Sequence, residues 1–386
     1  MNIHTRRQFI ARVAVAGAAC AAAPRLLLAA TDTERRFVFI IQRGAADGLA
    51  TIMPTGDTDL PRLRATLMAE GGTRLDAMFT AHPALVEIGR LYGQREALFA
   101  HAIATPYRDR SHFDAQNVLE TGGNEPYRLN DGWLNRLLTL LPGSEAQAIA
   151  LSATIPVALR GAVEVGSYAP SNLPEAHDDL KARIALLYEQ DPSLHELWQA
   201  ALAAQSIAGE SAAGGAKRDP AALGTLAARM LSGAGSARVA MIETLGWDTH
   251  FGQMGRLANE LKGLDALIAA LRTGLGDEWQ RTVVLVATEF GRTAAINGTG
   301  GTDHGTASAA MLIGGAVQGG RVIADWPGLA ANRLYEGRDL RATMSLDGFI
   351  AGALAEHYRL DPARIAATLF PQVQAPTVAA SGLIRS

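Results

Sequence analysis

The chain has almost no cysteine. Cys20 is the only one among 386 residues, and it lies within the first 30, which we interpret below as a removable signal. The rest of the chain therefore forms no disulfide, so a hydrophobic core has to hold the fold together. Hydrophobic residues make up 48% of the sequence and aromatic residues 6%, which is typical of an ordinary soluble core.

An excess of basic charge is also lacking. Lys and Arg number 35 against 38 Asp and Glu, and the formal net charge is −3. Loss of residues 1–30, which hold four arginines and no acidic residue, would change it to −7. A mildly acidic chain is a poor general binder of nucleic acid, so we expect no nucleic-acid partner.

Familiar catalytic and cofactor motifs are missing as well. The glycines of 44–48 open neither a P-loop nor a dinucleotide fingerprint, because no G-x-G-x-x-G or G-K-[ST] follows. No G-x-S-x-G stands between a strand and a helix, which excludes a serine hydrolase of the elbow type. Ser111 is followed by His-Phe-Asp, so it does not begin the C/S-x-P-x-R motif of the usual sulfatases.

The first 30 residues indicate an export signal. Arg6 and Arg7 precede an apolar pair and a weakly apolar, alanine-rich stretch, which is the twin-arginine pattern. We predict twin-arginine export to the periplasm, with cleavage near Ala30. The apolar stretch is short and broken by Pro24 and Arg25, so we expect no transmembrane segment in the mature chain.

Strand-like runs alternate with helical patterns over 31–386. The alternation predicts one α/β domain with a mostly parallel sheet, because crossover helices join parallel strands. Residues 176–232 show helical patterns only, and we predict a helical cap insertion there. The expected strands are 37–44, 97–104, 146–152, 239–246, 282–288 and 309–315.

Acidic and histidine side chains stand beside four of these runs. Asp47 follows the first run, Asp248 and His250 follow the fourth, Glu289 follows the fifth, and His304 precedes the last. Ligands of open α/β sheets bind where the carboxyl ends of the strands converge. Asp, Glu and His also bind hard to borderline metal ions. These residues therefore predict a metal site, and a metal-dependent hydrolase is the leading interpretation.

Six segments in one order carry a family resemblance: 43–49, 111–116, 120–122, 246–250, 288–293 and 301–305. Together they resemble the bacterial, twin-arginine-exported family called domain of unknown function 1501. That family looks like a distant branch of the alkaline phosphatase and sulfatase superfamily. The resemblance implies an α/β/α sandwich with a site for two metal ions, but it does not supply the family's reaction.

The superfamily pattern implies roles for single positions. Asp47 matches the aspartate after the first strand, Asp248 and His250 match loosely an Asp followed by a His, and His304 matches the last histidine. Ser111 and His112 stand where the nucleophile opens a helix. The chain departs from the pattern at Glu289, because Phe290 replaces an expected histidine ligand.

We therefore expect two ions, one held by Asp248, His250 and His304. The other would be held by Asp47 and Glu289, with His112 nearby. The ions would be Zn, Mn or Mg.

Three of these residues keep alternative roles. Ser111 is either a metal-activated nucleophile or a helix cap. His112 is a ligand, a general acid or a capping side chain. We expect Asp303 to hold His304 from behind, although it could also bind metal.

Arg43, Arg110 and Arg292 flank the motifs and are expected to bind an anionic substrate, since arginine forks suit phosphate and carboxylate. The substrate would be a small anionic compound or an ester. The alternative is a periplasmic binding or assembly protein that keeps the fold with a degenerate site.

Overall fold

A nine-stranded sheet runs through the structure, a computed structural model. It describes residues 34–142, 147–169, 178–189, 219–233, 236–373 and 381–385, with short pieces at 191, 194–195 and 198–199. Contacts group Asp32–Ser386 into one unit. The predicted export signal, 1–30, lies outside the described residues.

The main sheet has the strand order β11-β5-β10-β9-β1-β8-β6-β7, and β12 pairs with β5. Strand β1, at the centre, pairs in parallel with β8 and β9, whereas β10 runs antiparallel to β5 and β9. The sheet is therefore mixed but mostly parallel, as predicted, and all six expected strands are present. Its strands are β1 (Arg36–Gln42), β5 (Ala97–Ala104), β6 (Ala148–Leu151), β7 (Gly166–Ser167), β8 (Val239–Thr244), β9 (Thr282–Ala287), β10 (Ser308–Ile313), β11 (Val322–Ile323) and β12 (Met344–Ser345).

The first strand shows why the sheet is buried on both faces. Every residue of β1 is buried. Phe37, Phe39 and Ile41 belong to one hydrophobic cluster, and Val38 and Ile40 belong to another. Successive side chains of a strand point to opposite faces, so an unbroken apolar run needs a covering layer on each side.

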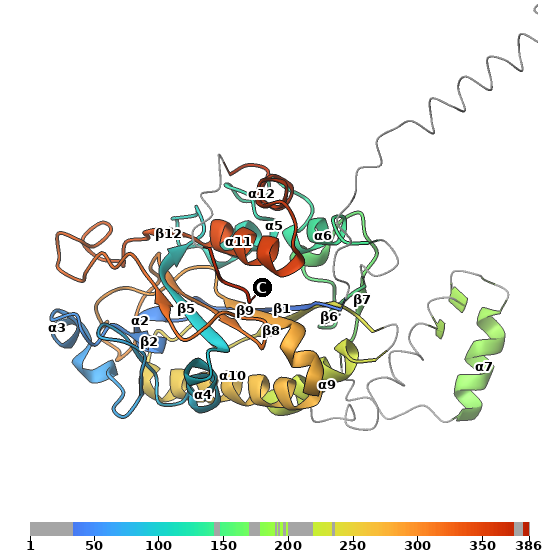
Figure 1. Ribbon diagram of the computed structural model, residues 1–386, viewed down its shortest axis with the longest axis horizontal. Helices are drawn as coiled ribbons and strands as arrows, with labels where there is room; N and C mark the ends of the chain where they lie inside the picture. The colour runs from blue at the N-terminus through green and yellow to red at the C-terminus, as the bar shows by residue number, and fades with distance from the viewer. Residues whose placement is uncertain are drawn as a thin grey trace, which may run out of the picture. The chain divides into compact units, whose positions relative to one another are not determined.

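Helices form those two layers, and the fold is an α/β/α sandwich (Figure 1). Cluster residues of one face come from α5 (His112–Thr121), α6 (Trp133–Leu138), α11 (Leu346–Tyr358) and α12 (Pro362–Leu369). Those of the other face come from α4 (Val86–Gly93), α9 (Pro220–Leu231) and α10 (Gln253–Leu275).

The predicted helical insertion needs a correction. Helices α7 (Asp178–Tyr188) and α9 lie at the two ends of 176–232. However, Leu226, Ala227 and Leu231 of α9 are buried in the core, and α9 packs along α10. This helix is therefore part of the sandwich layer and not a cap over it. Most of 190–218 lies outside the described residues, so a cap formed by the rest stays a prediction.

Smaller elements complete the fold. Strands β2 (Ile52–Met53), β4 (Thr80–Ala81) and β3 (Thr73–Arg74) form a second sheet. In sequence, α2 (Gly48–Thr51) comes directly before β2, and α3 (Leu60–Arg64) lies between β2 and β3. Among the described residues, we find no helix that is both long and apolar enough to cross a membrane.

One edge of the main sheet gathers the loops that matter for function. Strands β1, β5, β8 and β9 end at this edge, and the antiparallel β10 begins there. Gly44, which follows β1, has φ +117° and approaches the loop after β8 so closely that a Cβ would lie 2.6 Å from the nitrogen of Asp248. Only glycine permits this approach, which brings the two loops together.

Candidate metal centre

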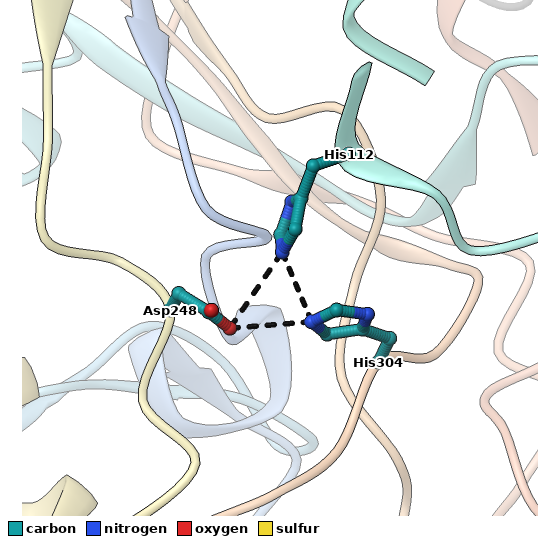
Figure 2. Close-up of side chains that lie close together, drawn as sticks. All are labelled: His112, Asp248 and His304. Atoms are coloured by element: carbon teal, nitrogen blue, oxygen red, sulfur yellow. Dashed lines mark hydrogen bonds and ion pairs between the residues drawn. The ribbon is translucent and has the colours of Figure 1, made fainter. Parts of the chain in front are cut away.

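Three ligand-type atoms converge at this edge, from His112, Asp248 and His304, and they lie within 4.8 Å of one another (Figure 2). The Nε2 atoms of His112 and His304 lie 2.9 Å apart. Asp248 Oδ1 lies 3.3 Å from the Nε2 of His304 and 3.7 Å from that of His112. His250 joins them, with its Nε2 2.9 Å from His304 Nε2 and 3.0 Å from Asp248 Oδ1.

The four residues come from three separate segments. His112 is the first residue of α5, Asp248 and His250 lie in the loop after β8, and His304 lies in the loop before β10. An isolated backbone bridge between Arg292 and His304 ties the loop after β9 to the same place. The structure therefore brings these four residues together at one sheet edge, as the sequence predicts.

The other ring nitrogen of each histidine faces an acceptor. Nδ1 of His112 lies 2.8 Å from Glu289 Oε1, and Nδ1 of His250 lies 3.1 Å from Asp303 Oδ1. Nδ1 of His304 lies 3.1 Å from the carbonyl oxygen of Arg110. Carboxylates and carbonyls only accept hydrogen bonds here, so each Nδ1 carries a proton and donates it. In the neutral rings, every Nε2 then presents a lone pair to the cluster.

This donor set fits a divalent ion. The Nε2 atoms of His112 and His250 both face that of His304, with Asp248 Oδ1 beside them, and a proton on the Nε2 of His304 could serve only one neighbour. A cation removes the repulsion among them. Tetrahedral ligands about 2.0–2.1 Å from zinc are separated by about 3.3 Å, close to the spacings between these atoms. Nitrogen-rich donors favour zinc over magnesium, which prefers oxygen.

Charge within the cluster moves the protonation equilibria in opposite directions. The hydrogen bond to Glu289 raises the pKa of His112. Burial, together with the nearby His112 and Arg292, lowers the pKa of His304. Burial alone would raise the pKa of Asp248, but the hydrogen bond and charge of Arg292 outweigh it and lower that pKa. Asp248 therefore remains a carboxylate, and His304 resists protonation.

Glu289 holds the ring of His112, and its predicted role as a metal ligand stays a prediction. Its side chain is fully buried. Besides His112, Oε1 accepts from the backbone N–H of Gly44 at 2.8 Å and from Gln116 Nε2 at 3.0 Å. Oε2 lies 3.0 Å from Thr288 Oγ1. Thr288 has one hydroxyl proton, and the carbonyl oxygen of Gln42 lies nearer to its Oγ1, at 2.7 Å. The donors therefore gather on Oε1, where the carboxylate holds the His112 ring from behind.

Asp47 is likewise not among the converging residues. It is fully buried and caps α2 by accepting from the N–H of Ala50. Its Oδ2 pairs with Arg64 Nη1 at 2.6 Å and accepts from Gln253 Nε2 at 2.5 Å. A guanidinium therefore holds the oxygen that was predicted to bind metal. The second ion at Asp47 and Glu289 stays a prediction, and Asp47 would have to give up its ion pair with Arg64 to hold it.

A hydrogen-bonded chain links Asp47 to the cluster. Gln253 bridges Asp47 and Thr302, whose hydroxyl lies 2.6 Å from Gln253 Oε1. Arg292 Nε donates to Thr302 at 3.3 Å, and its Nη1 donates to Asp248 Oδ1 at 2.8 Å. Asp47 thus acts as a buried anchor for the side chains that hold Asp248.

The three arginines predicted to bind substrate are engaged in ion pairs. Arg43 contacts Glu120 and Glu243, as well as Gln116. The two glutamates already neutralise the charge of the Arg43 guanidinium, and the Arg43 side chain is only 16% exposed.

Arg110 and Arg292 are similarly occupied. Arg110 pairs with Glu336 and Asp339, and what it supplies to the cluster is its backbone carbonyl. The Arg292 side chain is fully buried, with Nη1 paired to Asp248 and its buried Nη2 without a hydrogen-bond partner. All three arginines therefore form ion pairs, and their predicted role in binding substrate stays a prediction.

Ser111 and Asp303 differ in how closely they join the cluster. Ser111 is the N-cap residue of α5, but its side chain makes no capping hydrogen bond. Asp303 supports a histidine from behind, although its partner is His250 and not the predicted His304. Phe290, where the superfamily pattern has a histidine, stacks on the His112 ring with centroids 5.0 Å apart.

Several supporting residues were missed in the sequence. Gln116 stands four positions after His112, so its position on the same face of α5 was readable from helical spacing. Arg64, Gln253 and Thr302 gave no such signal, because each meets its partner through contacts between distant segments.

Comparison with known proteins gives a family but little more. The model of the family described as "Protein of unknown function (DUF1501)" matches residues 97–364, more than half of the chain. No curated protein matches.

Solved structures show slight likenesses. A phosphonate monoester hydrolase of Agrobacterium radiobacter is 11% identical, with 88% of this chain and 78% of that chain covered and a TM-score of 0.40. The C-terminal periplasmic domain of EcEptC from Escherichia coli, in complex with Zn, is 8% identical over 74% of both chains, with a TM-score of 0.38. A Bacteroides thetaiotaomicron protein from work on glycosaminoglycan metabolism is 9% identical over 88% and 74%, also with a TM-score of 0.38. At these TM-scores the site has to be interpreted from its own residues.

Proposed function

The chain belongs to the DUF1501 family of unknown function, and we propose that it is an exported, metal-dependent hydrolase of phosphate or related esters. One divalent ion, zinc by the nature of its ligands, is held by His112, Asp248, His250 and His304. The observation that carries this proposal is the orientation of three imidazoles, whose Nδ1 protons are bound and whose Nε2 atoms meet at Asp248 Oδ1.

An ion at this place would polarise a substrate oxygen and lower the pKa of a water or hydroxyl. The chain's own residues prepare the place for it. Glu289 and Asp303 hold two rings in the tautomer that binds metal, and the Arg110 carbonyl holds the third. Arg292 keeps Asp248 ionised and fixes its Oδ1. Because these supports are already in position, little reorganisation is needed when an ion binds.

The nucleophile is the least defined part of the proposal. Ser111 stands one residue before His112, at the start of α5, and its hydroxyl does not cap the helix. It therefore remains available for attack on an ester, while an activated water is the alternative. A Ser111→Ala variant that keeps full turnover would assign the attack to water.

Metal content and a substrate panel test the proposal. Wild-type protein should purify with about one zinc per chain and hydrolyse phosphomonoesters, phosphodiesters or related esters. His304→Ala should lose the zinc and the activity, while a His82→Asn control should keep both, because His82 lies outside the cluster and its Nδ1 accepts from the N–H of Ala84. Metal-free wild-type protein that turns over nothing would reject the proposal.

One observation favours the alternative of a binding or assembly protein. Phe290 stands where the superfamily pattern has a histidine, and Oδ2 of Asp47 pairs with Arg64. A chain that binds zinc tightly but hydrolyses no ester would fit this alternative, with the ion serving structure or recognition.

A further inference from the structure

A cavity of about 300 Å³ lies beside the proposed metal site. Its charged lining residues are Arg62, Arg338 and Asp303, and Leu63, Ile296 and Leu334 contribute apolar surface. A cavity of this volume stands at the lower end of the range for small-molecule sites. It suits a short ligand or the end group of a longer one.

The cavity shares a wall with the residues that support the metal ligands. Asp303, which accepts from His250, lines it directly. Arg338, on the same lining, donates from Nη2 to the carbonyl oxygen of His304. A ligand in the cavity would therefore lie next to the backs of two metal-binding histidines, and an attached group could reach the ion around Asp303.

The two arginines leave hydrogen-bonding capacity for an anion. Arg62 uses Nε and Nη2 on Asp59, and its side chain is 59% exposed. Arg338 forms an ion pair with Asp339 through Nε and donates a hydrogen bond from Nη2 to the His304 carbonyl. Within the described part of the chain, no hydrogen bond engages Nη1 of either guanidinium. Two such groups over an apolar wall match a ligand with an anionic end and a short apolar body.

We propose that this cavity binds the anionic end of the substrate, a carboxylate or phosphate carried on a short apolar chain. This assignment rests on the proposed hydrolase function, because it makes the cavity the part of the site that selects the substrate. It also replaces the three arginines predicted from the sequence, which are held in ion pairs, with Arg62 and Arg338.

Calorimetric binding of three matched probes to the full chain tests the assignment. Hexanoate and hexylphosphonate, which has no ester bond to hydrolyse, carry the proposed anionic ends, and 1-hexanol has the same apolar chain without charge. Both anions should bind more tightly than 1-hexanol. Arg62→Gln should weaken the binding of the preferred anion about tenfold and leave 1-hexanol unchanged, because a charge-assisted hydrogen bond is lost. The anion that depends more on Arg62 identifies the natural end group.

Arg62 is the better residue to replace, because Arg338 contacts the backbone of a metal ligand. Arg128→Gln is the matched control, since Arg128 is 67% exposed and pairs with Glu125 three residues before it, as Arg62 pairs with Asp59. Anions bound directly by the ion would not depend on Arg62. Equal binding by wild type and Arg62→Gln would therefore overturn the assignment.

The two proposals fail differently. If the wild type lacks zinc and esterase activity but binds an anion through Arg62, the hydrolase proposal falls and the cavity remains an anion site. If zinc and hydrolysis are present but anion binding does not depend on Arg62, only the cavity assignment falls.

Discussion

Replacing Glu289 with glutamine tests the orientation of His112 without removing its hydrogen bonds. Oε1 of Glu289 accepts from the N–H of Gly44, from His112 and from Gln116, and a glutamine carbonyl can accept all three. The amide nitrogen would replace Oε2 and donate to Thr288 Oγ1, which can still donate to a backbone carbonyl. The variant is nearly isosteric, so it removes little except the negative charge.

Losing that charge should weaken zinc binding about 10- to 100-fold, as is found when groups that hold metal-binding histidines are replaced. This corresponds to about 1.4–2.7 kcal/mol. The carboxylate makes the His112 ring more basic and stabilises the positive charge that builds on it when the ion binds. In metal-free protein the same charge raises the pKa of His112, so the variant should lower that pKa.

The assay is a competition titration of zinc against a chelator at pH 7, with histidine NMR titration of the metal-free protein. Glu243→Gln is the control, because Glu243 pairs with Arg43 and does not contact His112. Asp303→Asn should have a smaller effect than Glu289→Gln, since the Asp303 side chain is 57% exposed and water screens its charge. The reasoning would be falsified if Glu289→Gln folded normally and bound zinc as tightly as the wild type.

Three other perturbations separate the roles of further charged and titratable groups. Arg64→Met should lower the free energy of unfolding in urea by about 3–5 kcal/mol, because Asp47 loses its buried partner. Adding Asp47→Asn should restore much of that free energy. A double variant as unstable as Arg64→Met alone would refute this pairing. Asp248→Asn should lower the zinc content, whereas Asp47→Asn should not, as measured by metal analysis of folded protein; equal loss in both would restore the predicted role of Asp47. Burial lowers the pKa of His101 to about 4, and its Nδ1 accepts from a backbone N–H, so the folded state excludes a proton that the unfolded state binds. Stability is therefore full above about pH 6.5 and falls toward pH 4, by up to about 3 kcal/mol for this group; His101→Gln should flatten that part of the urea stability profile, and an unchanged profile would count against it.

Local patterns predicted the framework of the site well. Unbroken apolar runs such as 37–44 and 282–288 require burial on both faces, so they placed the central strands and the edge where their loops meet. The positions of Asp248, His250 and His304 beside those strands were enough to predict that they converge. His112 followed from its place at the start of a helix after another strand.

The sequence by itself therefore determined the α/β pattern, the strands and the residue types gathered at one sheet edge, because strand and helix periods are local properties. Only the tertiary structure decided which carboxylate lies beside the Nε2 atoms of the histidines. Asp47 and Glu289 looked equivalent to Asp248 in sequence, but Arg64 and Gln253 occupy the first, and Gly44, His112 and Gln116 occupy the second. A buried carboxylate is committed to whichever donors surround it, and those donors come from segments that meet only when the chain folds.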